Sequence, residues 1–413
     1  MSNTIPVLIT GAGPTGLSMA VELNRHGIAF RIIDKQTKPV PTSNALVAQT
    51  RTLEVWEDQG LLSDALTRGN ILRGFNFYAK NKNIIHLDLN ILNSDYPFVL
   101  GIAQHQTEVM LLDYLKNQGI SVERETELID FSEEKNQVKT TLRHPNGETE
   151  VLQADWVIAC DGARSLLRTR CHIPFLGKEL SQHFVLADLK IKSELPSNQV
   201  YAFMSDNGPL LLIQFDQNYS RLIAEVTHDP ELSAAKSVTD EQLKRLVRER
   251  SPFKLELEKP VWTSGFWIHE RIVSSYRHNN IFFAGDTAHI HSPAGGQGMN
   301  TGIQDVYNLA WKLALVINKK APSTLLDSYH IEREQVGKSV LKKTTLLTWM
   351  ISLHHPVLSF IRNWILSHVM RFEKIRKKIA EDMTQLAIHY KNSSVIEDHL
   401  KTCLGPPPGM RML

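Results

Sequence analysis

The first thirty-five residues alternate between apolar runs and glycine-rich turns in a regular order. Residues 5–10, IPVLIT, are typical of a short buried strand, and the glycines of residues 11–16 predict a turn after it. Residues 17–26 have the spacing of a helix, and Gly27 follows as its C-cap. The run AFRIIDK, residues 29–35, predicts the next strand. This order predicts the βαβ opening of a doubly wound α/β fold.

Two later segments change to the two-residue alternation of half-buried strands. They are residues 73–103, which include GFNFYAK and NIIHLDL, and residues 183–268, which include HFVLADLKIK and GPLLLIQFD. Residues 45–60 and 107–118 favour helices, and residues 121–160 favour strands that end in DWVIACDG. The pattern therefore predicts two insertions of antiparallel sheet into one nucleotide-binding domain.

The expected domain boundaries follow these changes of pattern, and the chain beyond about residue 324 is mostly helical. We expect a nucleotide-binding domain, an inserted β-sheet domain for the substrate, and a C-terminal helical region that ends in the Pro/Gly stretch GPPPGMRML. The nucleotide-binding domain would comprise residues 1–73, 104–182 and 269–335. The β-sheet domain would comprise residues 74–103 and 183–268, and the C-terminal region residues 336–413.

Composition changes this picture little. The chain has 413 residues, of which 42% are hydrophobic and 22% charged, so it can form a large core like an ordinary globular protein. Its net charge of +2 gives no strong field that favours nucleic acid or an anionic membrane. Cys160, Cys171 and Cys403 form no CxxC pair, which argues against a disulfide framework or a zinc site and favours a reducing cytoplasm.

We find no pattern of a signal peptide or a membrane span. The N-terminal run has no basic region before it, so it is interpreted as the first strand. The most apolar late segment, residues 351–370, is broken by Pro356, Arg362 and several histidines. Packing in the core or at an interface is the favoured interpretation of this segment, and a surface-lying amphipathic helix is the alternative.

The first turn has the spacing that binds a dinucleotide. GAGPTG places Gly11, Gly13 and Gly16 in a G-x-G-x-x-G motif, which serves a tight turn, close approach of a pyrophosphate and close packing of helix on strand. Asp34 stands at the end of the second strand, where a carboxylate accepts hydrogen bonds from an adenosine ribose. This motif does not separate NAD from FAD.

A second stretch, AGDTAHIHSPAGGQGMNTGIQD at residues 284–305, separates the two cofactors. Asp286 follows the apolar strand NIFFAG and can accept a hydrogen bond from a ribityl hydroxyl. The glycine-rich loop leads into a helix from about Asn300 to Ile317, whose N-terminal end favours negative charge on the edge of a flavin ring. Because a flat ring must lie against bare backbone, the glycines favour FAD. The apolar face of this helix is Ile303, Val306, Leu309, Leu313 and Ile317.

These motifs together resemble those of the single-component, FAD-dependent aromatic hydroxylases, the para-hydroxybenzoate hydroxylase-like monooxygenases. The similar stretches are GAGPTGL, CDGARSLLR and GDTAHIHSPAGGQGMNTGIQDVYNLAWKLA, with RTLEVWEDQGLL and QHQTEVMLLDYLKNQG as further segments. The resemblance is closest to phenol, polyketide and antibiotic hydroxylases and covers most of residues 5–335. It implies a Rossmann-type, glutathione-reductase-like FAD domain with an inserted antiparallel β-sheet substrate domain and C-terminal helices.

The resemblance also implies roles for individual residues. Asp34 would hold the adenosine ribose, Gln106 the pyrophosphate or ribityl region, and the backbone near Leu128 the adenine. Asp161 and Arg164 belong to a motif that is tied to both FAD and NADPH. The expected cofactor residues are Gly11, Gly13, Pro14, Thr15, Gly16, Asp34, Lys35, Arg51, Gln106, Leu128, Asp161, Arg164, Gly285, Asp286, Pro293, Gly298, Met299 and Asn300.

The expected substrate side rests on fewer residues. Phe203, Phe215 and Trp267 lie on or near the inserted sheet and could line the pocket, although a role as shielding core is equally well supported. No catalytic side chain is expected, because the cofactor carries the chemistry. His289 and His291 have no third ligand at a suitable spacing, so we expect loop hydrogen bonds there and no metal.

The activity that the resemblance implies is the hydroxylation of an aromatic, polyketide-like or antibiotic-like small molecule. It would use non-covalent FAD, O2 and NADPH or NADH, through a flavin C4a-hydroperoxide, in a cytoplasmic monomer or homodimer. A flavin oxidoreductase that inserts no oxygen and a flavin-binding protein without turnover are the alternatives. Other flavoenzyme signatures fit less well: Pro293 stands where a Baeyer–Villiger motif needs an aromatic residue, no second G-x-G-x-x-G opens a helix, and WTSGFW differs from the halogenase motif.

Two departures from the family pattern stand out. Where relatives carry an arginine before the RTLE segment, this chain has Asn44, which predicts one lost charge-assisted contact to FAD or to the nicotinamide. Larger relatives continue past the Pro/Gly stretch into a thioredoxin-like domain, and the sequence here ends at Leu413. The expectation is either a short branch of the family or a truncated product.

Overall fold

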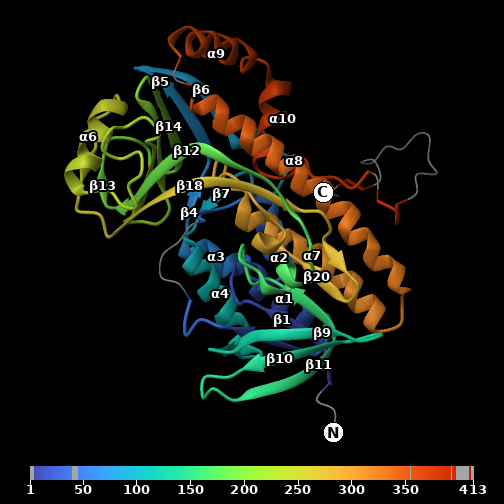
Figure 1. Ribbon diagram of the computed structural model, residues 1–413. Helices are drawn as coiled ribbons and strands as arrows, with labels where there is room; N and C mark the ends of the chain where they lie inside the picture. The colour runs from blue at the N-terminus through green and yellow to red at the C-terminus, as the bar shows by residue number, and fades with distance from the viewer. Residues whose placement is uncertain (1–3, 40–44, 354, 392, 397–408, 411–413) are drawn as a thin grey trace, which may run out of the picture.

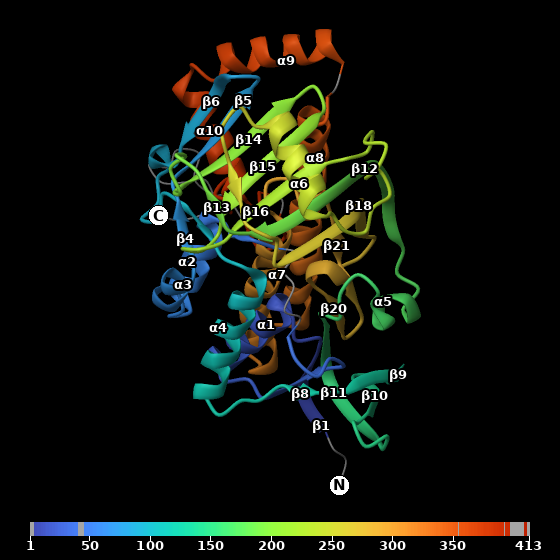
Figure 2. The same ribbon diagram turned by 90° about the vertical axis from the view of Figure 1, so that its left-hand side faces the viewer.

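Two large sheets, with helices between and around them, form the frame of the molecule (Figure 1). The computed structural model describes residues 4–39, 45–353, 355–391, 393–396 and 409–410. The first sheet lies near the N-terminal end in both views, and the second lies towards the opposite end (Figures 1 and 2). The mixed α/β class expected from the sequence is confirmed. Asn44 and Cys403 lie outside the described residues.

The first sheet contains the predicted βαβ unit at its centre. β1 pairs in parallel with β2 on one side and with β11 on the other. Because parallel strands end at the same edge, the turns that follow β1, β11 and β20 meet there. In spatial order the strands are β19 (Arg277–His278), β20 (Ile281–Phe283), β11 (Thr149–Ala159), β1 (Thr4–Thr10), β2 (Phe30–Asp34) and β8 (Glu123–Arg124), with β10 (Val138–Arg143) and β9 (Glu127–Glu133) paired onto β11 as a ribbon.

Two helices that begin at this edge pack against each other. They are α1 (Pro14–Arg25) and α7 (Gly298–Ile317). A Cβ atom at Gly302 of α7 would lie 2.4 Å from Thr15 Oγ1 of α1, so glycine permits this close approach. The predicted apolar face of α7 is buried at Ile303, Val306, Leu309 and Leu313, and the helix begins two residues earlier than expected.

The predicted helix at residues 45–60 is divided. Val47 and Ala48 form β3, because they pair with β7 (Val99–Gly101) in a small sheet with β4 (Asn70–Leu72), and α2 (Thr50–Asp58) follows. The segment predicted at residues 107–118 is α4 (Gln104–Asn117), which packs on α1. The remaining short elements are α3 (Leu62–Arg68), α5 (Leu166–Arg170), β13 (Ile191–Lys192), β17 (Glu256–Leu257), η1 (Leu89–Ile91), η2 (Gly285–Thr287) and η3 (Ser323–Leu326).

The second sheet takes its strands from both alternating segments and is antiparallel except where β14 meets β5. Its strands, in order, are β21 (His289–Ile290), β18 (Trp262–Val273), β12 (Phe175–Leu189), β16 (Ser220–Glu225), β15 (Gly208–Gln214), β14 (Gln199–Ser205), β5 (Gly74–Ala79) and β6 (Lys82–Asp88). One face is covered by α6 (Asp240–Arg250), which starts at a capping box formed by Thr239 and Gln242. The other face is turned towards the edge where α1 and α7 begin.

Three helices are the last ones among the described residues. α8 (Asp327–Ile351) contacts β19 of the first sheet and β18 of the second. α9 (Pro356–Val369) lies across the end of the molecule remote from the N-terminus in both views, beside the edge strand β6, and α10 (Glu373–Met383) follows (Figures 1 and 2). None of the described residues of α9 is buried. Of the core or interface packing expected for residues 351–370, core packing is found at Met370, which lies in an apolar cluster that Leu366 also packs against, and interface packing stays a prediction.

Candidate functional site

The first glycine turn has the geometry that its spacing predicts. Gly11 has a φ of +94°, and its N–H donates to the carbonyl of Ile33 at 2.8 Å. A Cβ at Gly16 would lie 1.9 Å from the Gly11 carbonyl oxygen, whereas a Cβ at Gly13 would meet no described protein atom within 4 Å. Gly13 caps α1 without a side-chain hydrogen bond, so the first N–H groups of this helix face open space.

Asp34 is held beside this turn at the end of β2. Its Oδ2 accepts a hydrogen bond from the Ala12 N–H at 2.6 Å, and its Oδ1 accepts one from the Gln36 N–H at 2.8 Å. Each carboxylate oxygen has a second lone pair, so the group can also accept bonds from ribose hydroxyls. Lys35, which follows it, is exposed.

A buried ionic network fixes the second turn. Gly285 has a φ of +61°, and its N–H donates to Asp305 Oδ2 at 3.0 Å, while His289 Nε2 lies 2.7 Å from the same oxygen. Arg333 donates from Nε to Asp305 Oδ1 at 2.7 Å. Burial alone would raise the pKa of Asp305, but Arg333 and His289 hold that pKa below its ordinary value. The turn that carries Asp286 is therefore rigidly placed.

Sequence reasoning missed Asp305 and Arg333 as parts of the site. Both side chains are fully buried. A usable signal existed, because Asp305 stands between Ile303 and Val306 on the apolar helix α7, where a charge requires a partner.

A cavity of about 410 Å³ connects both turns to the second sheet. Pro14 and Thr15 line one end of it, together with Gly13 and Asp286. Asp286 is exposed to this space, yet burial in the surrounding protein raises the pKa of its carboxyl. The loop at residues 291–299, which includes Pro293, forms the middle of the wall.

The N-terminus of α7 is the second uncapped helix end at this cavity. Gln297 is the N-cap and makes no side-chain cap bond, and Gly298 and Met299 line the cavity. Asn300 is fully buried instead: its Oδ1 accepts from the Gln49 N–H at 2.8 Å, and its Nδ2 donates to the Val47 carbonyl at 2.8 Å. The side chain of Asn300 therefore ties the loop to β3, and its backbone alone could serve a ligand.

Two buried polar atoms in the cavity wall have no hydrogen-bond partner among the described residues. They are Gln49 Oε1 and His291 Nε2. Burial, with the nearby His289, lowers the pKa of His291 to about 4, so this ring is neutral at pH 7. Its Nδ1 lies 2.8 Å from the Ser292 carbonyl, which is the hydrogen bond within the loop that was expected, whereas His289 bonds to Asp305 of α7. Unpartnered buried atoms of this kind fit a polar ligand.

Together these features fit FAD. The open space at Gly13 and the uncapped end of α1 suit a pyrophosphate, and the carboxylates of Asp34 and Asp286 suit hydroxyl groups. The uncapped end of α7 suits the polar edge of a flat ring.

The DG segment after β11 contributes its backbone to the cavity. Cys160 and Gly162 line the wall, and Asp161 accepts hydrogen bonds from Thr287 Oγ1 at 3.2 Å and from the Leu166 N–H at 3.1 Å. Burial raises the pKa of Asp161. Arg164 is exposed on the same segment.

Eleven of the eighteen expected cofactor residues are not among the described residues that line the cavity. Eight of them lie in or beside the turns described above, and the other three, Arg51, Gln106 and Leu128, make other contacts. Gln106 bonds the neighbouring His105 ring at 3.1 Å, Arg51 pairs with Glu54 at 2.8 Å, and Leu128 is buried in an apolar core cluster. Their cofactor roles stay predictions. Gln104, which the sequence did not single out, lines the cavity.

Residues of the second sheet form the far wall of the cavity, and those from β14, β15 and β16 are alternate residues of each strand. None of the three expected pocket residues is among the described residues of this wall. Phe203 is buried in the apolar cluster beneath α6, and Phe215 lies in another cluster. Trp267 packs against His183, with ring centres 4.7 Å apart and ring planes inclined at 42°. Successive strand residues point to opposite faces, so the neighbours of Phe203 line the wall instead. The wall residues are Phe75, Asn76, Phe77, Val200, Ala202, Met204, Pro209, Leu211, Ile213, Arg221 and Ile223.

Arg221 brings a charge into this mostly apolar wall. Its Nε and Nη2 each donate to Asp188, at 2.7 Å to Oδ1 and 2.7 Å to Oδ2. Its guanidinium carbon also lies 5.3 Å from the ring centre of Trp262. This bidentate, stacked arrangement holds the side chain in one orientation.

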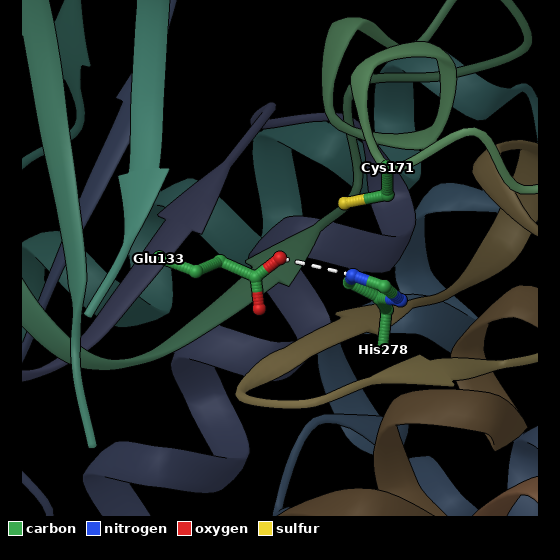
Figure 3. Close-up of side chains that lie close together, drawn as sticks. All are labelled: Glu133, Cys171 and His278. Carbon is green, nitrogen blue, oxygen red and sulfur yellow. Dashed lines mark hydrogen bonds and ion pairs between the residues drawn. The ribbon is translucent and has the colours of Figure 1, made fainter. Parts of the chain in front are cut away.

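One group of described residues outside the cavity has metal-ligating atoms close together: Glu133, Cys171 and His278 (Figure 3). His278 Nε2 lies 2.9 Å from Glu133 Oε1, and burial raises the pKa of the Cys171 thiol to about 12. Burial of a protonated thiol beside a Glu–His hydrogen bond is explained equally well by packing within the fold, without a metal ion. The group shares no residue with the cavity wall described above.

Within the described residues, we find no helix that is both long and apolar enough to cross a membrane.

Comparison with known proteins agrees with this geometry. The model of the FAD binding domain family matches residues 4–344. The chain is 33% identical over 414 residues to the 6-methylpretetramide 4-monooxygenase of Streptomyces rimosus, and the match covers 98% of this chain and 73% of that protein. It is 32% identical over 355 residues to the pentachlorophenol 4-monooxygenase of Sphingobium chlorophenolicum, covering 84% and 65% of the two chains. The solved structure of the OxyS anhydrotetracycline hydroxylase from Streptomyces rimosus superposes with a TM-score of 0.77 at 27% identity, covering 94% and 77%.

Proposed function

The chain belongs to the FAD binding domain family and is a flavin-dependent monooxygenase, and on this premise we propose that it hydroxylates an aromatic or polyketide-like small molecule. The observation that carries the proposal is one cavity that joins two uncapped helix ends and Asp286 to an apolar sheet wall. A flat, mostly apolar substrate would lie against that wall, beside the ring end of the cofactor.

When bound, FAD would accept electrons from NADPH or NADH and transfer an oxygen atom from O2 to the substrate. The end of α1 would bind the pyrophosphate, while Asp34 and Asp286 would accept hydrogen bonds from the ribose and the ribityl chain. The end of α7 would stabilise negative charge at the ring edge. Aliphatic residues of the wall, such as Val200 and Ile213, would exclude water from the reacting atoms.

Arg221 is proposed to orient a polar substituent of the substrate. It is the charged side chain among the described sheet residues of the wall, and Asp188 fixes its direction. We also propose that the protein works in a reducing cytoplasm, since Cys160 and Cys171 are free thiols.

The test has two stages. Purified protein should be yellow and should release FAD on heating or acidification, and a colourless protein that FAD titration leaves unchanged would refute the proposal. O2 consumption across phenols, polyketide aromatics and tetracycline-type compounds then identifies the substrate. Incorporation of labelled oxygen from O2 into product separates a hydroxylase from a flavin oxidoreductase without oxygen insertion and from a protein without turnover.

A further inference from the structure

Helix α9 presents its apolar side to solvent rather than to the protein. Its outward residues recur at helical spacing, and each is 45–70% exposed. They are Val357, Leu358, Phe360, Ile361, Trp364 and Ile365. An ordinary surface helix buries such a face, so this one indicates a surface that binds something else.

The side of α9 that faces the protein is partly polar. Arg362 donates from Nη1 to the carbonyl of Met350, at the end of α8, at 2.6 Å, and burial lowers the pKa of this guanidinium. Ser359 and Asn363 are half-buried on the same side. Because the polar residues point inward, the outward apolar face is not explained by packing within this chain.

The exposed apolar surface continues on both neighbouring elements. Leu346 and Trp349 are exposed on the last turns of α8, and Phe372 is exposed directly after α9. We call these three residues and the six of α9 the α9 face. Lys342 lies on the same side of α8, since it precedes Leu346 by four residues and Trp349 by seven.

Positive charge is concentrated around this face. Residues 342–383, from the last turns of α8 to the end of α10, contain eight Lys and Arg and three Asp and Glu, a net charge of +5, although the whole chain carries +2. Lys343 pairs with Asp382, and three further lysines of α10 line the cleft between α8 and α10 together with Glu381 and Asp382. Lys342 and Arg371 are exposed beside the apolar residues. The surface is therefore complementary to an anionic partner.

We propose that the α9 face docks on an anionic lipid surface. Exposed tryptophan and phenylalanine beside basic side chains suit the boundary between headgroups and acyl chains. α9 has 14 residues, which is enough to lie in that boundary but not to cross a bilayer. A second copy of this chain is the less favoured occupant, because a two-fold interface would bring Lys342 and Arg371 of both copies together.

The α9 face adjoins the cavity. Leu347 and Ile351 line the cavity from the last turns of α8, whereas Leu346 and Trp349 point outward from the same turns. A docked protein would hold this wall of its cavity close to the lipid. Apolar molecules dissolved in the bilayer would then have a short path to it, a consequence that rests on the proposed function.

The experiment uses the FAD-loaded protein and sedimentation with large vesicles of phosphatidylcholine, with or without phosphatidylglycerol. We expect binding at least tenfold tighter to the anionic vesicles, weakened by added salt, with a blue shift of tryptophan fluorescence. Phe360→Ser/Trp364→Ser should lose binding about tenfold or more, and Lys342→Glu/Arg371→Glu should lose the preference for anionic lipid. Both variants should keep their FAD content.

Matched controls change similar side chains at exposed sites elsewhere. Val151→Ser/Leu176→Ser removes two exposed apolar residues, and Lys135→Glu/Lys139→Glu reverses two exposed charges; neither should alter vesicle binding. Failure of the wild-type protein to bind anionic vesicles would overturn the proposal. So would a stable dimer in sedimentation equilibrium that is lost in Phe360→Ser/Trp364→Ser, since the face would then join two copies.

Discussion

At one end of the cavity the wall consists of contiguous stretches, residues 13–15 and 291–299. At the other end most of the wall consists of single residues taken alternately from β14, β15 and β16 of the second sheet. The contiguous stretches offer backbone N–H groups and space where a Cβ is absent. The second sheet offers side chains, and these side chains determine the shape of that end of the cavity. A cofactor that stays the same can be bound by backbone, while a substrate is selected by side chains, which vary without disturbing the fold.

The largest expected effect is a loss of stability, and it should distinguish Gly16 from Gly13 in the same turn. Gly16→Ala would place a Cβ 1.9 Å from a backbone oxygen, so we expect a loss of more than about 4 kcal/mol of stability or no soluble protein. Gly13→Ala meets no described protein atom, so the melting temperature of the apoprotein should hardly change while FAD affinity falls about tenfold or more. Thermal unfolding and flavin fluorescence titration measure both. Normal FAD affinity in Gly13→Ala would show that the cofactor does not approach there.

A second pair contrasts the two faces of β14. Phe203→Ala should cost about 3–5 kcal/mol of unfolding free energy, because it leaves a hole beneath α6. Ala202→Phe fills the cavity instead and should weaken substrate binding about tenfold with FAD content unchanged. Denaturant unfolding and substrate-dependent NAD(P)H oxidation measure the two effects. If Phe203→Ala changed substrate preference and Ala202→Phe did not, the assignment of the faces would be reversed.

The neutral His291 should make stability depend on pH. Its folded pKa of about 4 lies below the ordinary value of 6.5, so the unfolded chain binds the proton more tightly. The stability that the neutral His291 contributes to the folded state is therefore complete above pH 6.5. It is lost as the pH falls towards 4, and the free energy of unfolding decreases by at most about 3 kcal/mol. Denaturant unfolding of the apoprotein at several pH values should show a shallower decline in His291→Gln than in the wild type. Identical slopes would exclude His291 as the cause.

The smallest effect in this series concerns one hydrogen bond at the cofactor end. Asp286→Ala should weaken FAD binding about ten- to a hundredfold, as expected for a charged acceptor worth about 1.5–3 kcal/mol. Asp206→Ala, which removes an exposed acid from a hairpin of the second sheet, is the matched control and should bind FAD normally. Equal affinities in the two variants would mean that Asp286 serves another ligand.

The site residues that the sequence identified depend on neighbours along the chain, whereas those that it missed depend on partners from distant segments. Gly11, Gly16, Asp34 and Asp286 could be identified because each is bound to a local pattern of strand, turn and helix. Asp305 could not be assigned its role in this way, since its partner Arg333 comes from another helix.

By itself, the sequence determined the α/β class, the two turns that fit FAD and the apolar face of α7, because these depend on near neighbours and on backbone geometry. The tertiary structure alone decided which face of β14 meets the cavity, since alternation defines two faces and does not say what covers each. It also decided that the apolar side of α9 points outward. Helical spacing places those residues on one side, but only the packing of α8 and the second sheet determines which way that side faces.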